Sequence, residues 1–159
     1  MRITSLIILL PIVSCNQQPN TQNFQSQIDS MKSHLSQTYK PGFGEFMSSI
    51  QIHHEKLWFA GQNKNWKLAD FEVNEITEAL QDIRNYCTDR PEVQALPMIN
   101  AAMDSIKISI QQQNITSFKT NFILLTTTCN NCHKATKHEF NVIKLPEIPP
   151  FSNQEFKAP

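Results

Sequence analysis

The chain is poor in glycine, and no segment shows the strict alternation of apolar and polar residues that is typical of a half-buried β-strand. Glycine occurs only three times in 159 residues. Apolar residues recur instead at spacings of three and four, which is typical of amphipathic α-helices. These two absences argue against a β-rich architecture, and the sequence predicts an all-α domain.

An excess of charge and a membrane-spanning run are also absent. The 14 Lys and Arg residues balance the 14 Asp and Glu residues, so nothing in the charge favours nucleic acid as a partner. No apolar run reaches the roughly 20 residues that a membrane-spanning helix needs. Hydrophobic residues make up 40% of the chain, which is enough for one core and indicates one folded domain.

The longest apolar run lies at the amino terminus, where residues 3–13 follow the positive charge of Arg2. This pattern is typical of a secretory signal peptide, which we place at residues 1–14. The stretch ending at Cys15 resembles the lipobox of bacterial lipoproteins, in which that thiol carries lipid; an ordinary signal peptide with an incidental Cys15 is the alternative. Two or more acyl chains hold a protein stably on a membrane. We therefore expect a lipid-anchored protein of the bacterial cell envelope, facing the periplasm or the outer surface.

Polar residues 15–23 predict a flexible tether to a helical domain at residues 24–145. The last four predicted helices are joined by short connections, as in an antiparallel four-helix bundle, and one extra helix precedes them. Pro146, Pro149 and Pro150 predict an irregular tail at residues 146–159, packed on the bundle. The expected helices span residues 24–38, 44–61, 65–87, 95–113 and 115–135. The apolar stripe expected on the helix at 65–87 includes Phe71, with Glu72 as its polar exception.

The string Cys129-Asn-Asn-Cys132-His133 carries the chemistry that the sequence predicts. C-x-x-C-H is the attachment signature of c-type haem. On a helix, residues i and i+3 share a face and can reach two vinyl groups at one edge of the macrocycle, while an imidazole at i+4 can bind the iron. We therefore expect one haem c bound covalently through Cys129 and Cys132, with His133 as the proximal iron ligand.

Other interpretations of the cysteines stay open. A disulfide between Cys129 and Cys132 would close only a very small loop and stabilise the fold little. A thioredoxin-like redox pair is normally preceded by a strand in a βαβ unit, and a zinc site would require a second Cys/His pair. Cys87 is expected to be a free thiol near a helix end, with an intermolecular disulfide as the alternative.

An exported helical bundle with C-x-x-C-H near the end of its last helix resembles the cytochrome c-prime and c-556 superfamily. The resemblance covers residues 40–138, and residues 40–61 and 149–156 are similar to segments of small bacterial haem proteins of this type. Relatives of this type often form a homodimer through the first two bundle helices. The haem iron itself favours electron transfer with a redox partner protein, and enzymatic turnover is not indicated because no acid/base pair or second metal site accompanies the motif. The extra N-terminal helix and the long tail depart from the pattern.

The second axial position distinguishes two functions. In an antiparallel bundle the helix at 44–61 begins near the end where His133 lies, and the c-556 type supplies a thioether ligand at the position of Met47. His54 lies seven residues on, about 10.5 Å along the axis, so one iron cannot bind both. Core packing is the alternative for Met47. For His53 and His54, the alternative to iron ligation is that one faces solvent and the other makes a hydrogen bond in the core or to a haem propionate. An electron carrier with Met47 as ligand is expected; a five-coordinate module for NO or CO, or a structural lipoprotein with an accidental motif, are the alternatives.

Overall fold

The computed structural model describes residues 21–38 and 41–159, and the chain divides into two units, residues 1–39 and 40–159. Within the described residues every regular element is helical and no strand occurs, which confirms the all-α prediction. None of these helices is long and apolar enough to cross a bilayer. The elements are α1 (Thr21–Gln37), α2 (Phe43–Gln62), α3 (Trp66–Tyr86), the 3₁₀-helix η1 (Pro91–Ile99), α4 (Asn100–Gln111) and α5 (Ile115–Ala135).

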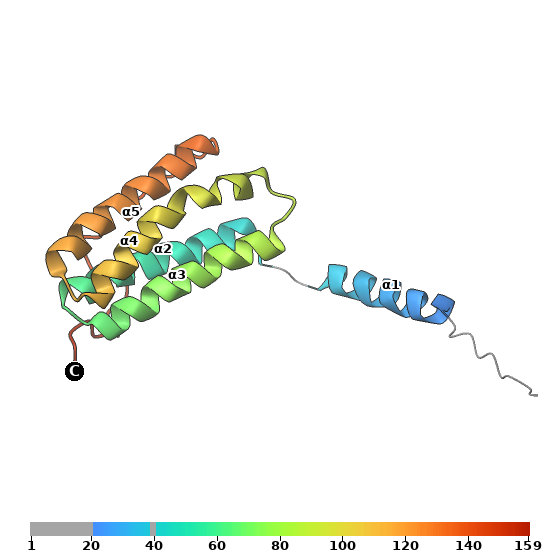
Figure 1. The fold of residues 1–159 in the computed structure, drawn as a ribbon, viewed down its shortest axis with the longest axis horizontal. Coiled ribbons are helices and arrows are strands. Elements are labelled where there is room, and N and C mark those ends of the chain that lie inside the picture. Colours follow the sequence, from blue (N-terminus) through green and yellow to red (C-terminus); the bar gives the residue numbers. More distant parts are fainter. Residues whose placement is uncertain (1–20, 39–40) are drawn as a thin grey trace, which may run out of the picture. The chain divides into compact units, whose positions relative to one another are not determined.

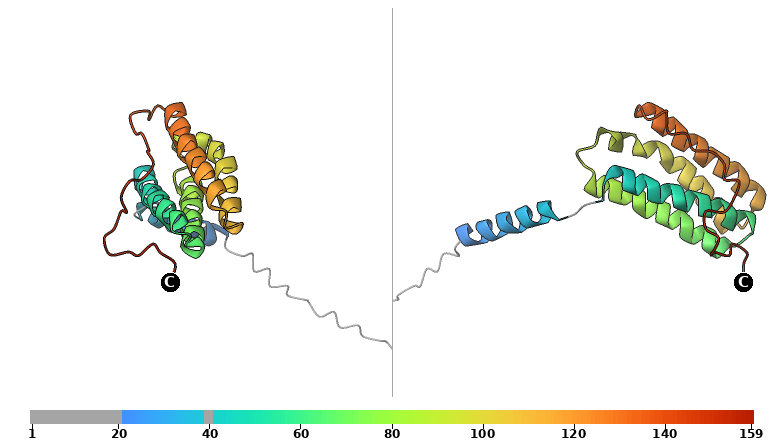
Figure 2. Two further views of the ribbon diagram at one scale, coloured as in Figure 1. Left: turned by 90° about the vertical axis from the view of Figure 1, so that its left-hand side faces the viewer. Right: turned by 180° about the vertical axis from the view of Figure 1, so that it is seen from behind.

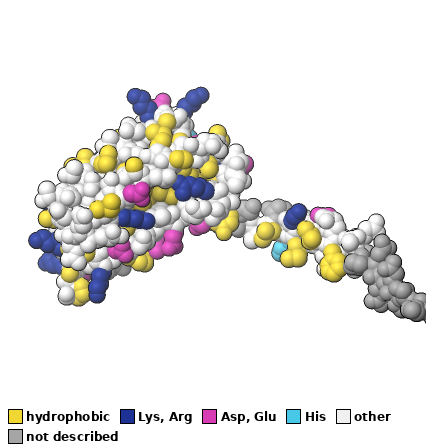
Figure 3. All heavy atoms as spheres, viewed as in Figure 1, with side chains coloured by type: hydrophobic (Ala, Val, Ile, Leu, Met, Phe, Trp, Pro, Cys, Tyr) yellow, Lys and Arg dark blue, Asp and Glu magenta, His cyan; other side chains and the backbone are white. Residues whose placement is uncertain are grey.

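The described part of the first unit consists of α1 and Thr38. The helix begins at Thr21, so residues 21–23, which were expected in the tether, are helical. Its apolar side chains are exposed within this unit and can be seen along the helix in Figure 3. They are Phe24, Ile28, Met31 and Leu35. The predicted signal peptide, Cys15 and residues 16–20 of the tether lie outside the described residues.

The second unit holds α2 to α5, and consecutive helices reverse direction (Figure 1). α2 packs mainly against α3 and α4 mainly against α5, while further contacts join α3 to α4 and α2 to α5. Apolar side chains from all four helices form one core between them. The largest fully buried ones are Leu57, Ile76, Ile83, Ile106, Phe118, Phe122 and Leu125.

One expected helix is divided. Residues 95–113 were predicted as a single α-helix, whereas the structure has η1 up to Ile99 and then α4. Pro97 lies inside η1 and disfavours the α conformation of Leu96, the residue before it, and it has no N–H to donate to the residue four positions earlier. The α-helix therefore begins only after Pro97, and η1 leads the chain across the end of α5, which it contacts.

The turn between α2 and α3 and the turn between α4 and α5 have the same conformation, in which a residue with a left-handed backbone precedes an asparagine N-cap. Lys64 has φ 56° and Gln113 has φ 51°, conformations usually taken by glycine, which this chain hardly contains. The next residue, Asn65 or Asn114, accepts a backbone N–H three residues on with its side-chain oxygen. Each turn therefore ends one helix and starts the next within three residues.

Residues 136–159 form an irregular tail without helix or strand, which begins ten residues before the expected boundary at 146. The tail lies along the helices of this unit (Figure 2). Near its end, Phe156 is buried with its ring 5.7 Å from that of Phe59, and the Lys157 carbonyl accepts from Asn65 Nδ2. These contacts tie the tail to the turn between α2 and α3.

α2 and α5 are in tight contact where a glycine faces an aromatic ring. Gly61 is buried in the last turn of α2, and a Cβ at this position would overlap the ring of Phe118, which is fully buried on α5. The missing side chain therefore makes room for the ring.

Replacing this glycine tests how tightly the two helices pack. Gly61→Ala should lower the free energy of unfolding by about 2–3 kcal/mol, because the overlap with Phe118 outweighs the better helix propensity of alanine. Phe118→Leu in the Gly61→Ala background should recover part of the loss, as measured in a double-mutant cycle by denaturant unfolding. Additive losses would mean that the two residues are not coupled.

Candidate functional site

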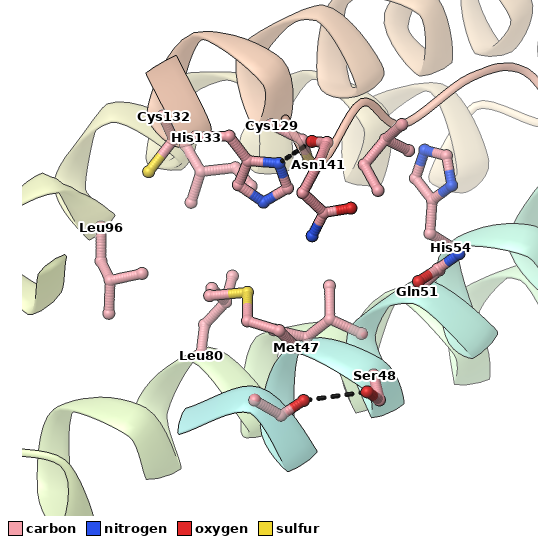
Figure 4. A pocket seen from close by; sticks show the side chains of 14 residues that line it. Met47, Ser48, Gln51, His54, Leu80, Leu96, Cys129, Cys132, His133 and Asn141 are labelled. Atoms are coloured by element: carbon pink, nitrogen blue, oxygen red, sulfur yellow. Dashed lines mark hydrogen bonds between the residues drawn. The ribbon is translucent and has the colours of Figure 1, made fainter. Parts of the chain in front are cut away.

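A cleft of about 170 Å³ opens between α2, α3, η1 and α5, and the start of the tail forms part of its rim. Four predicted site residues line it together: Met47, Cys129, Cys132 and His133 (Figure 4). His54 lines it too. Cys87 does not; it is a buried free thiol at the carboxyl end of α3. The apolar lining comes from Ile50, Leu80, Leu96, Ile99 and Ile143.

The two cysteines of the string are partly buried free thiols on α5. Burial, together with the neighbouring Cys132, raises the pKa of Cys129 to about 12, and burial also raises the pKa of Cys132. Cys132 Sγ donates to the carbonyl of Ala95 in η1 at 3.8 Å. Both sulfurs are therefore neutral thiols near neutral pH, which makes them weak nucleophiles for thiol–disulfide exchange.

The zinc interpretation requires about four ligands of the Cys, His and carboxylate type. Across residues 21–38 and 41–159, no three or more His, Cys, Asp or Glu side chains gather as a metal ion would require.

His133 is held at the end of α5 by a backbone carbonyl of the tail. Its Nδ1 lies 2.7 Å from the Asn141 oxygen. Because a carbonyl can only accept, Nδ1 carries the hydrogen and the lone pair of the neutral ring is on Nε2. The chain reaches this position because Lys137 adopts a left-handed conformation, φ 63°, and the His138 N–H closes the helix on the His133 carbonyl at 2.7 Å.

Met47 lies across the cleft from this imidazole. It lies in the second turn of α2, and Figure 4 shows its sulfur directed into the gap between α2 and the His133 ring. The structure therefore places a thioether and an imidazole on opposite walls of one cleft, as the antiparallel topology predicted.

His54 lies on the same helix, but its ring is held in the core. Its Nε2 lies 2.9 Å from Thr126 Oγ1, and that hydroxyl donates to the Phe122 carbonyl at 2.9 Å. Since the hydroxyl has one hydrogen, it accepts from His54, so Nε2 carries the hydrogen. Burial lowers the pKa of His54 to about 4, and the ring packs 4.4 Å from that of Phe122. His54 is a neutral residue that joins α2 to α5.

The neighbouring His53 has a partner that sequence reasoning missed. Its Nδ1 lies 2.6 Å from Glu72 Oε2, and the Glu72 side chain is 1% exposed. The sequence contained an indication of this pair, because Glu72 lies on the apolar stripe of α3 and a buried carboxylate needs a polar partner. His53 was expected either to face solvent or to make a polar contact; it is 17% exposed and paired.

The roles of two asparagines, Asn130 within the string and Asn141 in the tail, were also missed. Asn141 supplies its backbone carbonyl to His133, and Asn130 makes two hydrogen bonds with the backbone of Ile143. The first contact has no signature in the sequence, because any residue has a carbonyl.

Comparison of the chain with known protein families, with curated proteins and with solved structures finds no match. What the site can do therefore follows from its own geometry.

The buried neutral His54 predicts a loss of stability in mild acid. The unfolded chain takes up this proton near pH 6.5 and the folded protein only near pH 4, so the free energy of unfolding should fall as the pH falls between these values, by roughly 3 kcal/mol from this group. His54→Gln can still donate to Thr126 and does not titrate. Its free energy of unfolding, measured with urea at several pH values, should fall less steeply with acid than that of the wild type.

His34→Gln, on an exposed position of α1, is the matched control and should follow the wild-type pH profile. Parallel profiles for the wild type and His54→Gln would show that His54 is not the group responsible.

Proposed function

We propose that this protein is a monohaem c-type cytochrome, with haem c bound through Cys129 and Cys132 and its iron bound by His133. The observation that carries the proposal is the hydrogen bond from His133 Nδ1 to the Asn141 carbonyl. Metal-binding histidines usually donate their second ring N–H in this way, which leaves the other nitrogen for the metal. Here that nitrogen belongs to the wall of the cleft that also carries both thiols.

The donor set fits covalent attachment. Each thioether forms when an S–H adds across a vinyl group: a carbon–sulfur bond forms, and the hydrogen goes to the adjacent vinyl carbon. This addition needs reduced cysteines, and Cys129 and Cys132 are both free. They lie three residues apart on α5 and so can reach one edge of a planar ring. The apolar side chains of α2, α3 and η1 would cover its faces and exclude water.

Electron transfer is the function that this site supports best. Haem iron supplies a one-electron couple, and the axial ligands and their surroundings set its potential. His133 would hold one axial position, and Met47, which lines the same cleft, would hold the other. A thioether ligand favours the ferrous state. His54 is a poor candidate for ligation because Nε2 is engaged by Thr126. The electrons would be exchanged with a redox partner protein, without enzymatic turnover at the haem.

The proposal also includes the bundle that holds the haem, the membrane anchor and the oligomeric state. Helices α2 to α5 each contact two of the others, which supports an antiparallel four-helix bundle similar to that of cytochromes c-prime and c-556. Export and a lipid anchor at Cys15 would place the haem domain in the bacterial envelope, held by a tether and α1. A homodimer of the kind found in relatives of this type would use α2 and α3.

Covalent attachment is tested with the two thiols. Expressed in a periplasm with a haem-maturation system, the protein should be red and should keep its haem through denaturing electrophoresis. Cys129→Ala together with Cys132→Ala should lose the haem stain, because no thioether can form. Cys87→Ala, which removes a buried thiol outside the cleft, is the control and should keep it. A colourless wild-type protein would contradict the proposal.

The sixth ligand is tested by Met47→Leu, which keeps the size of the side chain and removes the sulfur. The wild type should be low-spin in the ferric state, and the variant should become high-spin, bind carbon monoxide readily and have a lower reduction potential. His54→Ala should leave the visible spectrum almost unchanged. A wild type that is already high-spin and binds carbon monoxide would instead identify a gas-binding module, and loss of the low-spin spectrum in His54→Ala would identify bis-histidine ligation.

A further inference from the structure

The first asparagine of the C-x-x-C-H string clamps the tail onto α5. Asn130 Nδ2 donates to the Ile143 carbonyl at 2.8 Å, and the Ile143 N–H donates to Asn130 Oδ1, also at 2.8 Å. One side-chain amide thereby pairs with both backbone groups of a single residue, as a neighbouring strand would. Asparagine is suited to this because its amide offers a donor and an acceptor side by side.

This clamp lies two residues beyond the carbonyl that holds the histidine. Asn141 accepts from His133 Nδ1, and its own N–H donates to the His138 carbonyl at 2.9 Å. Beyond Ile143 the tail meets α2 again at Phe151, whose ring lies 5.2 Å from Lys56 Nζ, and its end is held by Phe156 and Lys157. Two side chains of α5, Asn130 and His133, therefore hold residues 141–143 by hydrogen bonds. Without Asn130, only the hydrogen bond from His133 would remain between an α5 side chain and these residues.

We propose that Asn130 is a positioning residue for the iron ligand: it holds residues 141–143 so that the Asn141 carbonyl stays on His133 Nδ1. This role rests on the proposed haem function. Donating to a carbonyl raises the basicity of an imidazole and strengthens its bond to ferric iron. Asn130 therefore lowers the reduction potential through His133, without touching the haem itself.

The direction of the potential change separates positioning from simple packing. Weaker donation from His133 to ferric iron raises the potential. Opening the tail without affecting His133 would only admit water to the cleft, and water stabilises the additional charge of the ferric site and lowers the potential. The two effects have opposite signs.

The experiment compares the full-length matured protein with Asn130→Ala, Asn130→Ser and Asn131→Ala. Asn131 is the matched control, because it is the adjacent residue of the same string and is exposed. Amide hydrogen exchange at residues 141–143 and the midpoint potential are measured in all four proteins. Asn130→Ala should accelerate exchange at Ile143 about tenfold to a hundredfold, because two hydrogen bonds are lost, and should raise the potential.

Asn130→Ser is neutral, like the wild type, and its shorter side chain can keep at most one of the two hydrogen bonds, so it should fall between the wild type and Asn130→Ala in both measurements. It also serves as the test if Asn130→Ala does not mature. Asn131→Ala should match the wild type in both. An unchanged or lowered potential in Asn130→Ala and Asn130→Ser, with faster exchange, would overturn the positioning role and leave the cytochrome proposal intact. A wild-type protein without covalent haem would overturn both.

Discussion

The hydrogen bond from His133 Nδ1 to the Asn141 carbonyl is the contact on which the rest of the site depends. It determines which ring nitrogen has a lone pair, and it requires the chain to turn back after α5. That reversal uses Lys137 in a left-handed conformation and the His138 N–H bond to the His133 carbonyl. The end of α5 and the first residues of the tail are therefore one structural unit, built around the imidazole that we propose as the iron ligand.

A second requirement is that α2 stays opposite α5, because Met47 faces His133 only in that arrangement. Successive turns of α2 meet α5 through different contacts. His54 bonds to Thr126, the Trp58 ring lies 4.8 Å from that of Phe122, and Gly61 makes room for Phe118. Two of these contacts are apolar and one is a buried hydrogen bond between neutral groups. The alignment therefore needs no buried charge, and its directional hydrogen bond fixes the register of the two helices.

Much of the fold was predictable because helical periodicity and the residues that start and end helices can be recognised from short stretches of sequence. The helix predicted at residues 44–61 is observed as Phe43–Gln62, and the one predicted at 115–135 is observed with the same bounds. The stripe on α3 was partly wrong: Phe71 was expected inside but is 53% exposed, since five residues from Ile76 correspond to about 140° around the helix. The site was predictable as far as the string and Met47. The route of the tail was not, because it depends on backbone groups of Asn141 and Ile143 that any residue would supply.

The central claim is that Cys129 and Cys132 carry one haem through two thioether bonds. The most direct measurement is tandem mass spectrometry of the wild-type protein after maturation, denaturation and treatment with a thiol-alkylating reagent. The account predicts that the proteolytic fragment containing residues 129–133 is heavier by one haem and that neither cysteine is alkylated, whereas Cys87 is. A fragment of unmodified mass in which both Cys129 and Cys132 are alkylated, or in which they are joined as a disulfide, would contradict it.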